Sequence, residues 1–433
     1  MRRCHACPQV PSPLTRTLSS MRSALPPNAA PPSASSPTPP PPAPTELPSP
    51  PSSSSAARGD GPGLPRSPSI SRSKSTDAAD ANAAPLSREE QRRLKFEELL
   101  DAEVVDLTAL KALSWSGIPA GCRAMSWQLL LDYLPPNREW RAATLERKRR
   151  DYLSAVPQNF DISDDQRTDY QKKLLHQVLI DVPRTAPNAP VFHHPPVQRC
   201  LERILYIWAL RHPASGYVQG INDLVTPFFF VFLCARLPDA RPATADDVDA
   251  LPEGALCEIE ADAYWCLSKL LDAIQDHYTF AQPGIQRMVF KLSELVARID
   301  APLHTHLTEQ GLQFIQFAFR WMNCLLMREL SLDLIMRLWD TYLAEHGADD
   351  SSGGYDSGAG SSGFAVLHVY TCAALLKHYS SELLAMEFSE LVTFIQHLPT
   401  TGWSTKEVEL LLSQAYVFRA HFHASPAHLS GSR

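Results

Sequence analysis

Hydrophobic residues recur at helical spacing over most of the second part of the chain. The segment IQRMVFKLSELVARI is a clear example, because its apolar residues fall three or four positions apart and form a single stripe along a helix. That stripe consists of Ile285, Met288, Val289, Leu292, Leu295, Val296 and Ile299. Comparable stripes occupy residues 198–211, 259–277, 312–327, 364–377 and 405–418. No stretch alternates like a series of strands and no repeat of fixed period is present, so the pattern predicts an all-α fold.

The sequence before the helical pattern has a different composition. The first 85 residues contain 20 of the 38 prolines together with many serines and alanines, which leaves too little apolar surface to offset the entropy of ordering the chain. We therefore expect a long disordered Pro/Ser-rich tail, then one all-helical domain made of a core, a flexible Gly/Ser-rich insertion and C-terminal helices, and finally a short disordered end. The corresponding residues are 1–86 for the tail, 87–424 for the domain, 117–345, 346–363 and 364–424 for its three parts, and 425–433 for the end.

Charge and composition exclude several classes of protein. The formal net charge is -7, so the chain lacks the positive field of a nucleic-acid-binding protein. The longest apolar run, residues 224–235, is too short to cross a bilayer and contains Pro227, so no transmembrane segment is expected. An odd number of cysteines scattered through apolar segments is typical of free thiols in the cytoplasm. The isolated C-x-x-C of Cys4 and Cys7 lacks a second ligand pair, and no metal site is predicted.

The stretch DVPRT, residues 181–185, ends a helical pattern at a proline. Pro183 has no amide hydrogen and disfavours helical geometry at the preceding residue, so we expect the helix to end near Asp181. Arg184 then follows on an irregular segment stiffened by further prolines, from which its guanidinium projects. Asp181 is placed to orient that guanidinium in a bidentate pair that leaves other N–H groups for a ligand. The alternative interpretation is a surface ion pair at a helix end.

A second unusual stretch, SGYVQGIND, follows a strongly apolar helical segment. Gly216 and Gly220 bracket its central residues and permit close backbone approach or unusual dihedral angles around Gln219. The side-chain amide of a glutamine both donates to and accepts from water. The alternative is a helix start at which Gln219 and Asn222 satisfy local backbone groups.

An arginine and a glutamine on two rigid joints, with no nucleophile or general base beside them, suit a reaction that needs charge stabilisation and an oriented water. Phosphoryl transfer is such a reaction, because its transition state spreads charge over phosphate oxygens. The sequence contains no G-x-x-x-x-G-K-[ST] loop. We therefore expect Arg184 to act on a nucleotide that another protein binds.

Three blocks of the sequence together resemble the TBC domain, the all-helical family of GTPase-activating proteins for Rab GTPases. GIPAGCRAMSWQLLLDYLP resembles the family's opening block, VLIDVPRT its arginine-finger block and YVQGIN its glutamine-finger block, with Val178 in place of the family's leading isoleucine. Later segments, RWMNCLLMREL and MRLWDTYL, are also similar to family blocks. The resemblance covers residues 117–424 and is strongest to the subgroup of TBC1 domain family member 22 and its Golgi-associated relatives.

The resemblance implies a multi-helix TBC fold and a role in vesicle trafficking as a Rab GTPase-activating protein. Arg184 would be the arginine finger and Gln219 the glutamine finger, both supplied in trans to a GTP-bound Rab. The residues expected to support these fingers or to bind the partner are Asp181, Tyr217, Gly220, Asn222, Arg123 and Trp127. We expect no hydrolase activity in the chain alone and no cofactor of its own, because the GTP and Mg²⁺ would belong to the partner. The rival hypothesis is a helical scaffold that binds Rab or Golgi proteins without accelerating hydrolysis.

Two further expectations concern packing and the tail. Large aromatic residues at helical spacing usually lie in a core, so we interpret Trp127, Trp321 and Trp339 as packing residues. In the tail segment RSKS, Ser73 and Ser75 are candidate phosphoacceptors, and phosphorylated Ser75 would recruit a 14-3-3-type adaptor. The protein is expected in the cytoplasm, with a peripheral association at Golgi membranes.

Overall fold

The computed structural model describes residues 87–347 and 363–423 of the chain. All the described residues belong to a single compact unit. The described residues form helices and turns without any named strand. The all-α class is therefore confirmed for this part of the chain.

Three sequence predictions fall on residues outside the described ranges. They are the predicted tail with its candidate phosphoacceptors, most of the Gly/Ser-rich insertion, and the short end of the chain, and the residues concerned are 1–86 (with Cys4, Cys7, Ser73 and Ser75), 348–362 and 424–433.

The first group of helices runs from the start of the described residues to α11. Its members are α2 (Arg88–Asp101), α3 (Leu107–Ser114), α4 (Ala120–Leu130), α5 (Arg138–Asn159), η1 (Asp164–Gln166), α6 (Asp169–Asp181), η2 (Val182–Arg184), η3 (Pro190–His193), α7 (Pro195–Arg211), α8 (Ile221–Leu224), α9 (Thr226–Cys234), η4 (Pro238–Ala240), α10 (Ala245–Asp249) and α11 (Ala255–Ala273).

The second group contains the remaining helices. Its members are η5 (Gln275–His277), α12 (Pro283–Ile299), α13 (Ala301–Glu309), α14 (Phe314–Cys324), α15 (Leu332–Ala344), α16 (Gly363–His378), α17 (Ser380–Leu383), α18 (Phe388–Gln396) and α19 (Thr405–Phe422).

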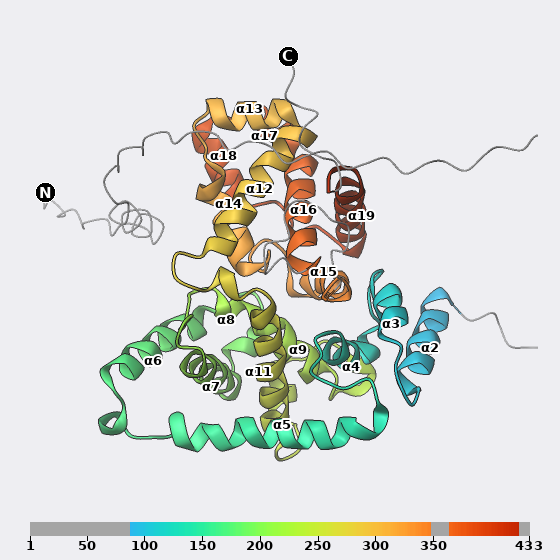
Figure 1. Ribbon diagram of the computed structural model, residues 1–433, viewed down its shortest axis with the longest axis vertical. Helices are drawn as coiled ribbons and strands as arrows, with labels where there is room; N and C mark the ends of the chain where they lie inside the picture. Colours follow the sequence, from blue (N-terminus) through green and yellow to red (C-terminus); the bar gives the residue numbers. More distant parts are fainter. Residues whose placement is uncertain (1–86, 348–362, 424–433) are drawn as a thin grey trace, which may run out of the picture. The chain divides into compact units, whose positions relative to one another are not determined.

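Helix α11 lies at the centre of the first group and packs against α5, α7 and α9 (Figure 1). Its burial brings carboxylates into the interior, and each is bound by residues of neighbouring helices. Glu260 accepts hydrogen bonds from Tyr152 of α5 at 2.6 Å and from Arg203 of α7 at 2.8 Å. Because buried charges must be paired, these bonds fix how α5 and α7 pack on α11.

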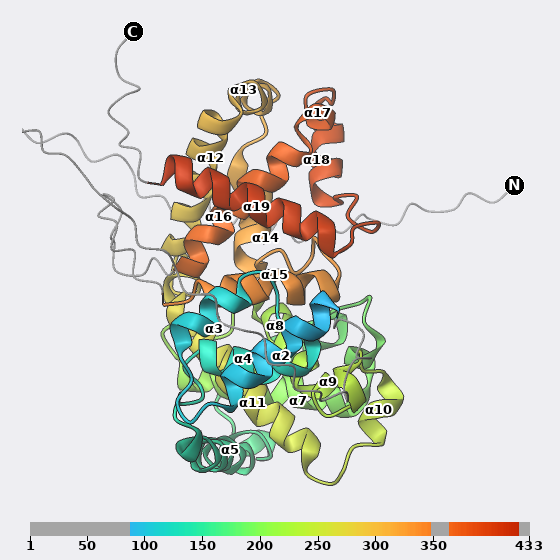
Figure 2. The same ribbon diagram turned by 90° about the vertical axis from the view of Figure 1, so that its right-hand side faces the viewer.

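Helix α16 holds the corresponding position in the second group, where α12, α15 and α19 pack against it; α19 lies across it in Figure 2. The apolar stripe predicted for residues 285–299 faces this interior. All its members are buried except Ile299, which is partly buried against the core. The three tryptophans interpreted as packing residues are at most 1% exposed, which confirms that prediction.

The apolar segment after Gly220 forms two helices. The short helix α8 is followed by α9, with Val225 between them. Pro227 lies in the first turn of α9, where its missing amide hydrogen costs no helical bond. Both helices are buried throughout. None of the helices in the described ranges combines the length and apolar character that crossing a membrane requires.

Candidate functional site

The end of α6 places Arg184 at the surface. Thr168 and Gln171 begin the helix with a capping box, and the helix ends at Asp181, as the sequence predicts. Pro183 then lies within the single turn η2, a regular 3₁₀ turn where an irregular segment was expected. The side chain of Arg184 is 47% exposed at the end of this turn.

Leu174, Leu175, Val178 and Leu179 form an apolar stripe along α6, and only half of it is buried. Leu174 and Val178 lie in the core, and the valine that replaces the family's isoleucine is fully covered. Leu175 is partly buried, whereas Leu179 is 41% exposed and Ile180 is 52% exposed. The last turn of α6 therefore carries an apolar surface directly before Asp181.

Asp181 and Arg184 form an ion pair at the helix end, as the alternative interpretation expected, but the carboxylate is buried, with only 6% of its side chain exposed. The pairing is not bidentate, because Arg184 donates through one nitrogen to Oδ1 alone. The second carboxylate oxygen, Oδ2, accepts a hydrogen bond from the hydroxyl of Tyr217 at 2.7 Å. Asp181 thus joins the arginine turn to the loop that carries Gln219.

The glutamine loop needs both of its glycines. Gly216 and Gly220 have positive φ angles of 62° and 112°, a region that residues with a side chain rarely adopt. At Gly220, an added Cβ would also lie 2.2 Å from Nδ2 of Asn323. This close approach holds the turn at Gln219, whose side chain is exposed and has no hydrogen-bond partner among the described residues.

Asn222 connects the two segments and is 1% exposed. Its Oδ1 accepts a hydrogen bond from the backbone N–H of Gly220 at 3.0 Å, and its Nδ2 donates to the hydroxyl of Thr185 at 2.9 Å. Thr185 in turn donates to the backbone carbonyl of Asp181 at 3.0 Å. Asn222 therefore satisfies a local backbone group, as the alternative interpretation expected, but Gln219 does not.

Burial strengthens these polar contacts. The pKa of the Tyr217 phenol is raised by burial first and by the neighbouring Asp181 second. The phenol therefore remains protonated and keeps its hydroxyl hydrogen for the carboxylate. An arginine turn and a glutamine loop that share buried hydrogen bonds are restricted in their relative movement.

Sequence reasoning missed three residues that support the glutamine loop, namely Asn323, Arg328 and Asp223. Asn323 of α14 donates from Nδ2 to the backbone carbonyl of Gln219 at 2.9 Å. Arg328 donates from Nε to the buried Asp223 at 2.7 Å. Burial raises the pKa of Asp223, and Arg328 opposes that rise. The only signal in the sequence was the presence of Asn323 and Arg328 in a family-like block, because their partners lie about a hundred residues away.

Arg123 and Trp127 belong to a different cluster. Both donate to the buried Asp340 of α15: the Nε of Arg123 at 3.0 Å and the indole N–H of Trp127 at 2.8 Å. The backbone N–H of Ile118 binds the same carboxylate at 2.8 Å. Trp127 is fully buried, so this cluster supports the packing of α4 on α15 and offers no tryptophan surface to a partner.

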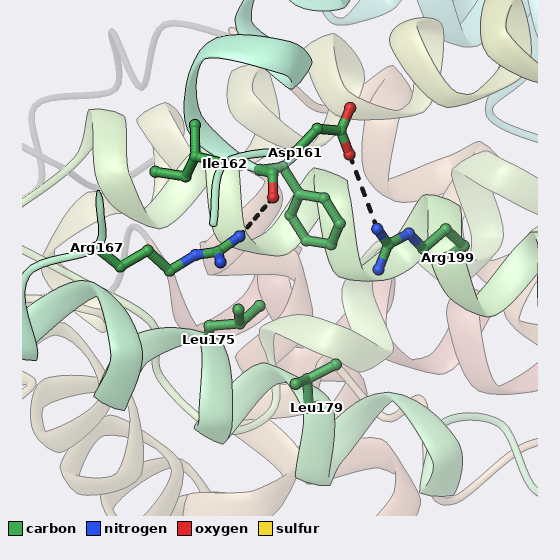
Figure 3. A pocket seen from close by; sticks show the side chains of 7 residues that line it. Asp161, Ile162, Arg167, Leu175, Leu179 and Arg199 are labelled. Atoms are coloured by element: carbon green, nitrogen blue, oxygen red, sulfur yellow. Dashed lines mark hydrogen bonds and ion pairs between the residues drawn. The ribbon is translucent and has the colours of Figure 1, made fainter. Parts of the chain in front are cut away.

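A cavity of about 370 Å³ lies beside α6. Figure 3 shows Leu175 and Leu179 on one side, with Arg167 and Arg199 on the others. Both guanidinium groups are already engaged, since Arg167 binds the carbonyl of Phe160 and Arg199 lies 3.7 Å from the carboxylate of Asp161. The cavity shares α6 with the arginine turn but contains none of the candidate site residues. Within residues 87–347 and 363–423, no cluster of three or more His, Cys, Asp or Glu side chains is arranged to hold a metal ion.

Comparisons with known proteins identify similar chains. Residues 121–384 match the sequence profile of the Rab-GTPase-TBC domain. The chain is 49% identical to the GTPase-activating protein gyp1 of Schizosaccharomyces pombe over 83% of its own length and 66% of that relative. It is 46% identical to human TBC1 domain family member 22A over 84% of its length and 67% of that relative.

A solved structure also resembles the described fold. The crystal structure of the Ypt/Rab-GAP domain of Gyp1p superimposes with a TM-score of 0.70 and 42% sequence identity. The superposition covers 78% of this chain and 100% of that domain.

Proposed function

The chain belongs to the Rab-GTPase-TBC domain family, and from this membership we propose that it stimulates GTP hydrolysis by a Rab GTPase. The proposal assigns two catalytic side chains, Arg184 and Gln219, which would enter the partner's nucleotide site. The partner would bring the GTP and its Mg²⁺. A protein with this activity would act in vesicle trafficking, and the Golgi is the proposed site of action.

Arg184 would neutralise the charge that develops on the γ-phosphate during hydrolysis. An arginine supplied in trans accelerates hydrolysis by roughly 10³- to 10⁵-fold. The observation that carries this assignment is the combination of an exposed guanidinium with a buried carboxylate partner. Because Asp181 contacts only one nitrogen of Arg184, the other N–H groups remain available for phosphate oxygens.

Gln219 would orient the attacking water. Its backbone carbonyl is held by Asn323 and its turn by Gly220, whereas its side-chain amide is exposed. This arrangement fixes the position of the residue without occupying its amide. The shared hydrogen bonds of Tyr217 and Asn222 support a fixed relation between the glutamine loop and the arginine turn, as a reaction that requires both side chains at once demands.

The test is single-turnover phosphate release from a panel of GTP-loaded Rab proteins. We expect the wild type to accelerate GTP hydrolysis by at least one Rab. With Arg184→Ala in its place, the stimulated rate of hydrolysis should be lower by about 10³-fold or more. Gln219→Ala should also reduce kcat strongly, with a smaller effect on binding. A matched control is Arg150→Ala, because Arg150 is an exposed arginine that pairs with Glu146 on α5.

The same experiment separates activation from scaffolding. If the protein is a scaffold, the wild type and Arg184→Ala should bind GTP-loaded Rab equally well. The wild type should then not change the rate at which the Rab hydrolyses GTP. Wild-type protein that binds a Rab without accelerating any member of the panel would refute the activator assignment.

A further inference from the structure

We propose that Phe280 is a docking residue that inserts its ring into an apolar depression on the GTP-bound Rab, next to the nucleotide site. This inference rests on the proposed function and extends it from the reacting groups to partner binding. Phe280 is 94% exposed, more than any other large hydrophobic side chain among the described residues. The transfer of a phenylalanine ring out of water is strongly favourable, and large aromatic residues contribute much of the binding free energy of interfaces.

The loop that carries Phe280 is held in place at both ends. It connects η5 to α12, and the residues before it, His277 and Tyr278, are buried. After it, Gln282 donates from its side-chain amide to the backbone carbonyl of His277 at 2.9 Å. Gln282 itself has a φ of 47°, a left-handed conformation that costs a residue with a side chain some free energy.

Close packing behind the loop limits its movement further. An added Cβ at Gly284 would lie 2.5 Å from Oδ1 of Asp276, so α12 begins directly against η5. Arg287 of α12 forms an ion pair with the same aspartate. A ring displayed on a loop fixed in this way loses little conformational freedom on binding, which favours affinity.

The loop shares its support with the glutamine loop. Tyr278 donates from its hydroxyl to the backbone carbonyl of Asn323 at 2.9 Å. The side chain of Asn323 donates to the backbone carbonyl of Gln219 at 2.9 Å. Phe280 follows Tyr278 by two residues, so their Cα atoms are at most about 7 Å apart. Two hydrogen bonds thus connect the loop of Phe280, through Asn323, to the loop of Gln219, as contact of both loops with one partner would require.

The decisive experiment measures the kinetics of Phe280→Ala against the Rab that the wild type activates. We expect KM to rise at least about 10-fold, equivalent to about 1.4 kcal/mol of binding free energy. The kcat should stay within about twofold of wild type, because a docking residue does not touch the reacting atoms. Phe280→Leu should recover part of the affinity. The dissociation constant for Rab loaded with a non-hydrolysable GTP analogue should change in parallel with KM.

The matched control is Trp140→Ala, which truncates another exposed aromatic residue, 62% exposed, on α5. This variant should leave KM and kcat unchanged. Because the Phe280 ring is almost fully exposed, its removal should not alter the urea midpoint of unfolding, and a shift in that midpoint would indicate a structural role instead.

Each alternative outcome is distinguishable. An unchanged KM and dissociation constant for Phe280→Ala, with an active wild type and an inactive Arg184→Ala, overturns the docking role alone. A fall in kcat without a change in KM also overturns it, since the loop would then act by positioning Gln219. Wild-type self-association that Phe280→Ala abolishes, with unchanged Rab affinity, assigns the ring to a second copy of the chain. A wild type that activates no Rab refutes the proposed function. The dissociation constants of wild type and Phe280→Ala for a Rab that the wild type binds then still test the docking role.

Discussion

The hydroxyl of Tyr217 offers a direct test of how the arginine turn and the glutamine loop are held together. Tyr217→Phe removes one oxygen and keeps the ring. The hydroxyl donates to Oδ2 of Asp181 at 2.7 Å and lies 3.3 Å from Oδ1 of Asn222. Without it, the carboxylate of Asp181 retains Arg184 as its side-chain partner among the described residues, but its second oxygen loses a donor in a buried position.

The magnitude follows from the charge and burial of Asp181. A hydrogen bond to a charged group contributes about 1.5 to 3 kcal/mol, and an oxygen left without a donor in a buried position costs a similar amount. We therefore expect Tyr217→Phe to lower the free energy of unfolding by about 2 kcal/mol. We also expect kcat for Rab activation to fall by about tenfold, because each 1.4 kcal/mol of lost transition-state stabilisation costs that factor.

Urea unfolding followed by far-UV circular dichroism measures the first effect, and single-turnover phosphate release measures the second. Tyr416→Phe is the matched control, because Tyr416 is 53% exposed and its hydroxyl has no hydrogen-bond partner among the described residues. It should change neither quantity. If Tyr217→Phe unfolds at the wild-type urea concentration and retains the wild-type kcat, then the Tyr217–Asp181 bond does not hold the two segments together.

Three further predictions follow from the same structure. Gly220→Ala should destabilise the fold by about 1 to 3 kcal/mol and lower kcat, because the residue has a positive φ and its Cβ would displace Asn323; circular dichroism and phosphate release measure the two effects. Asp340→Ala should lower the free energy of unfolding, measured in urea, by about 3 to 5 kcal/mol, because Arg123 and Trp127 both lose their buried acceptor. Burial lowers the pKa of His368 to about 3, so the unfolded chain takes up a proton that the folded chain does not. The contribution of His368 to stability should therefore fall by up to about 1.4 kcal/mol per pH unit as the pH drops below about 6.5. Stability curves from pH 7 to 5 should accordingly be shallower for His368→Gln than for wild type.

The sequence alone determined the class of fold and the local form of the candidate site. The apolar stripe of α12 was readable because helical periodicity depends only on residues three or four positions apart. The end of α6 at Asp181 was readable because Pro183 acts on its immediate neighbours. The glycines around Gln219 likewise indicated an unusual backbone, and both have positive φ. The assignment of catalytic roles to Arg184 and Gln219 came from the motif resemblance and remains a prediction.

Only the tertiary structure decided which distant residues support these segments. Asp181 receives a hydrogen bond from Tyr217, which neither interpretation of its pairing with Arg184 included, and Gln219 is held by Asn323, 104 residues further along the chain. The exposure of Phe280 was equally hidden, because an aromatic residue beside a helical segment usually packs inward. Such contacts depend on how helices remote in sequence pack together. A hydrogen bond between distant residues requires a distance and an orientation that packing sets and local sequence does not.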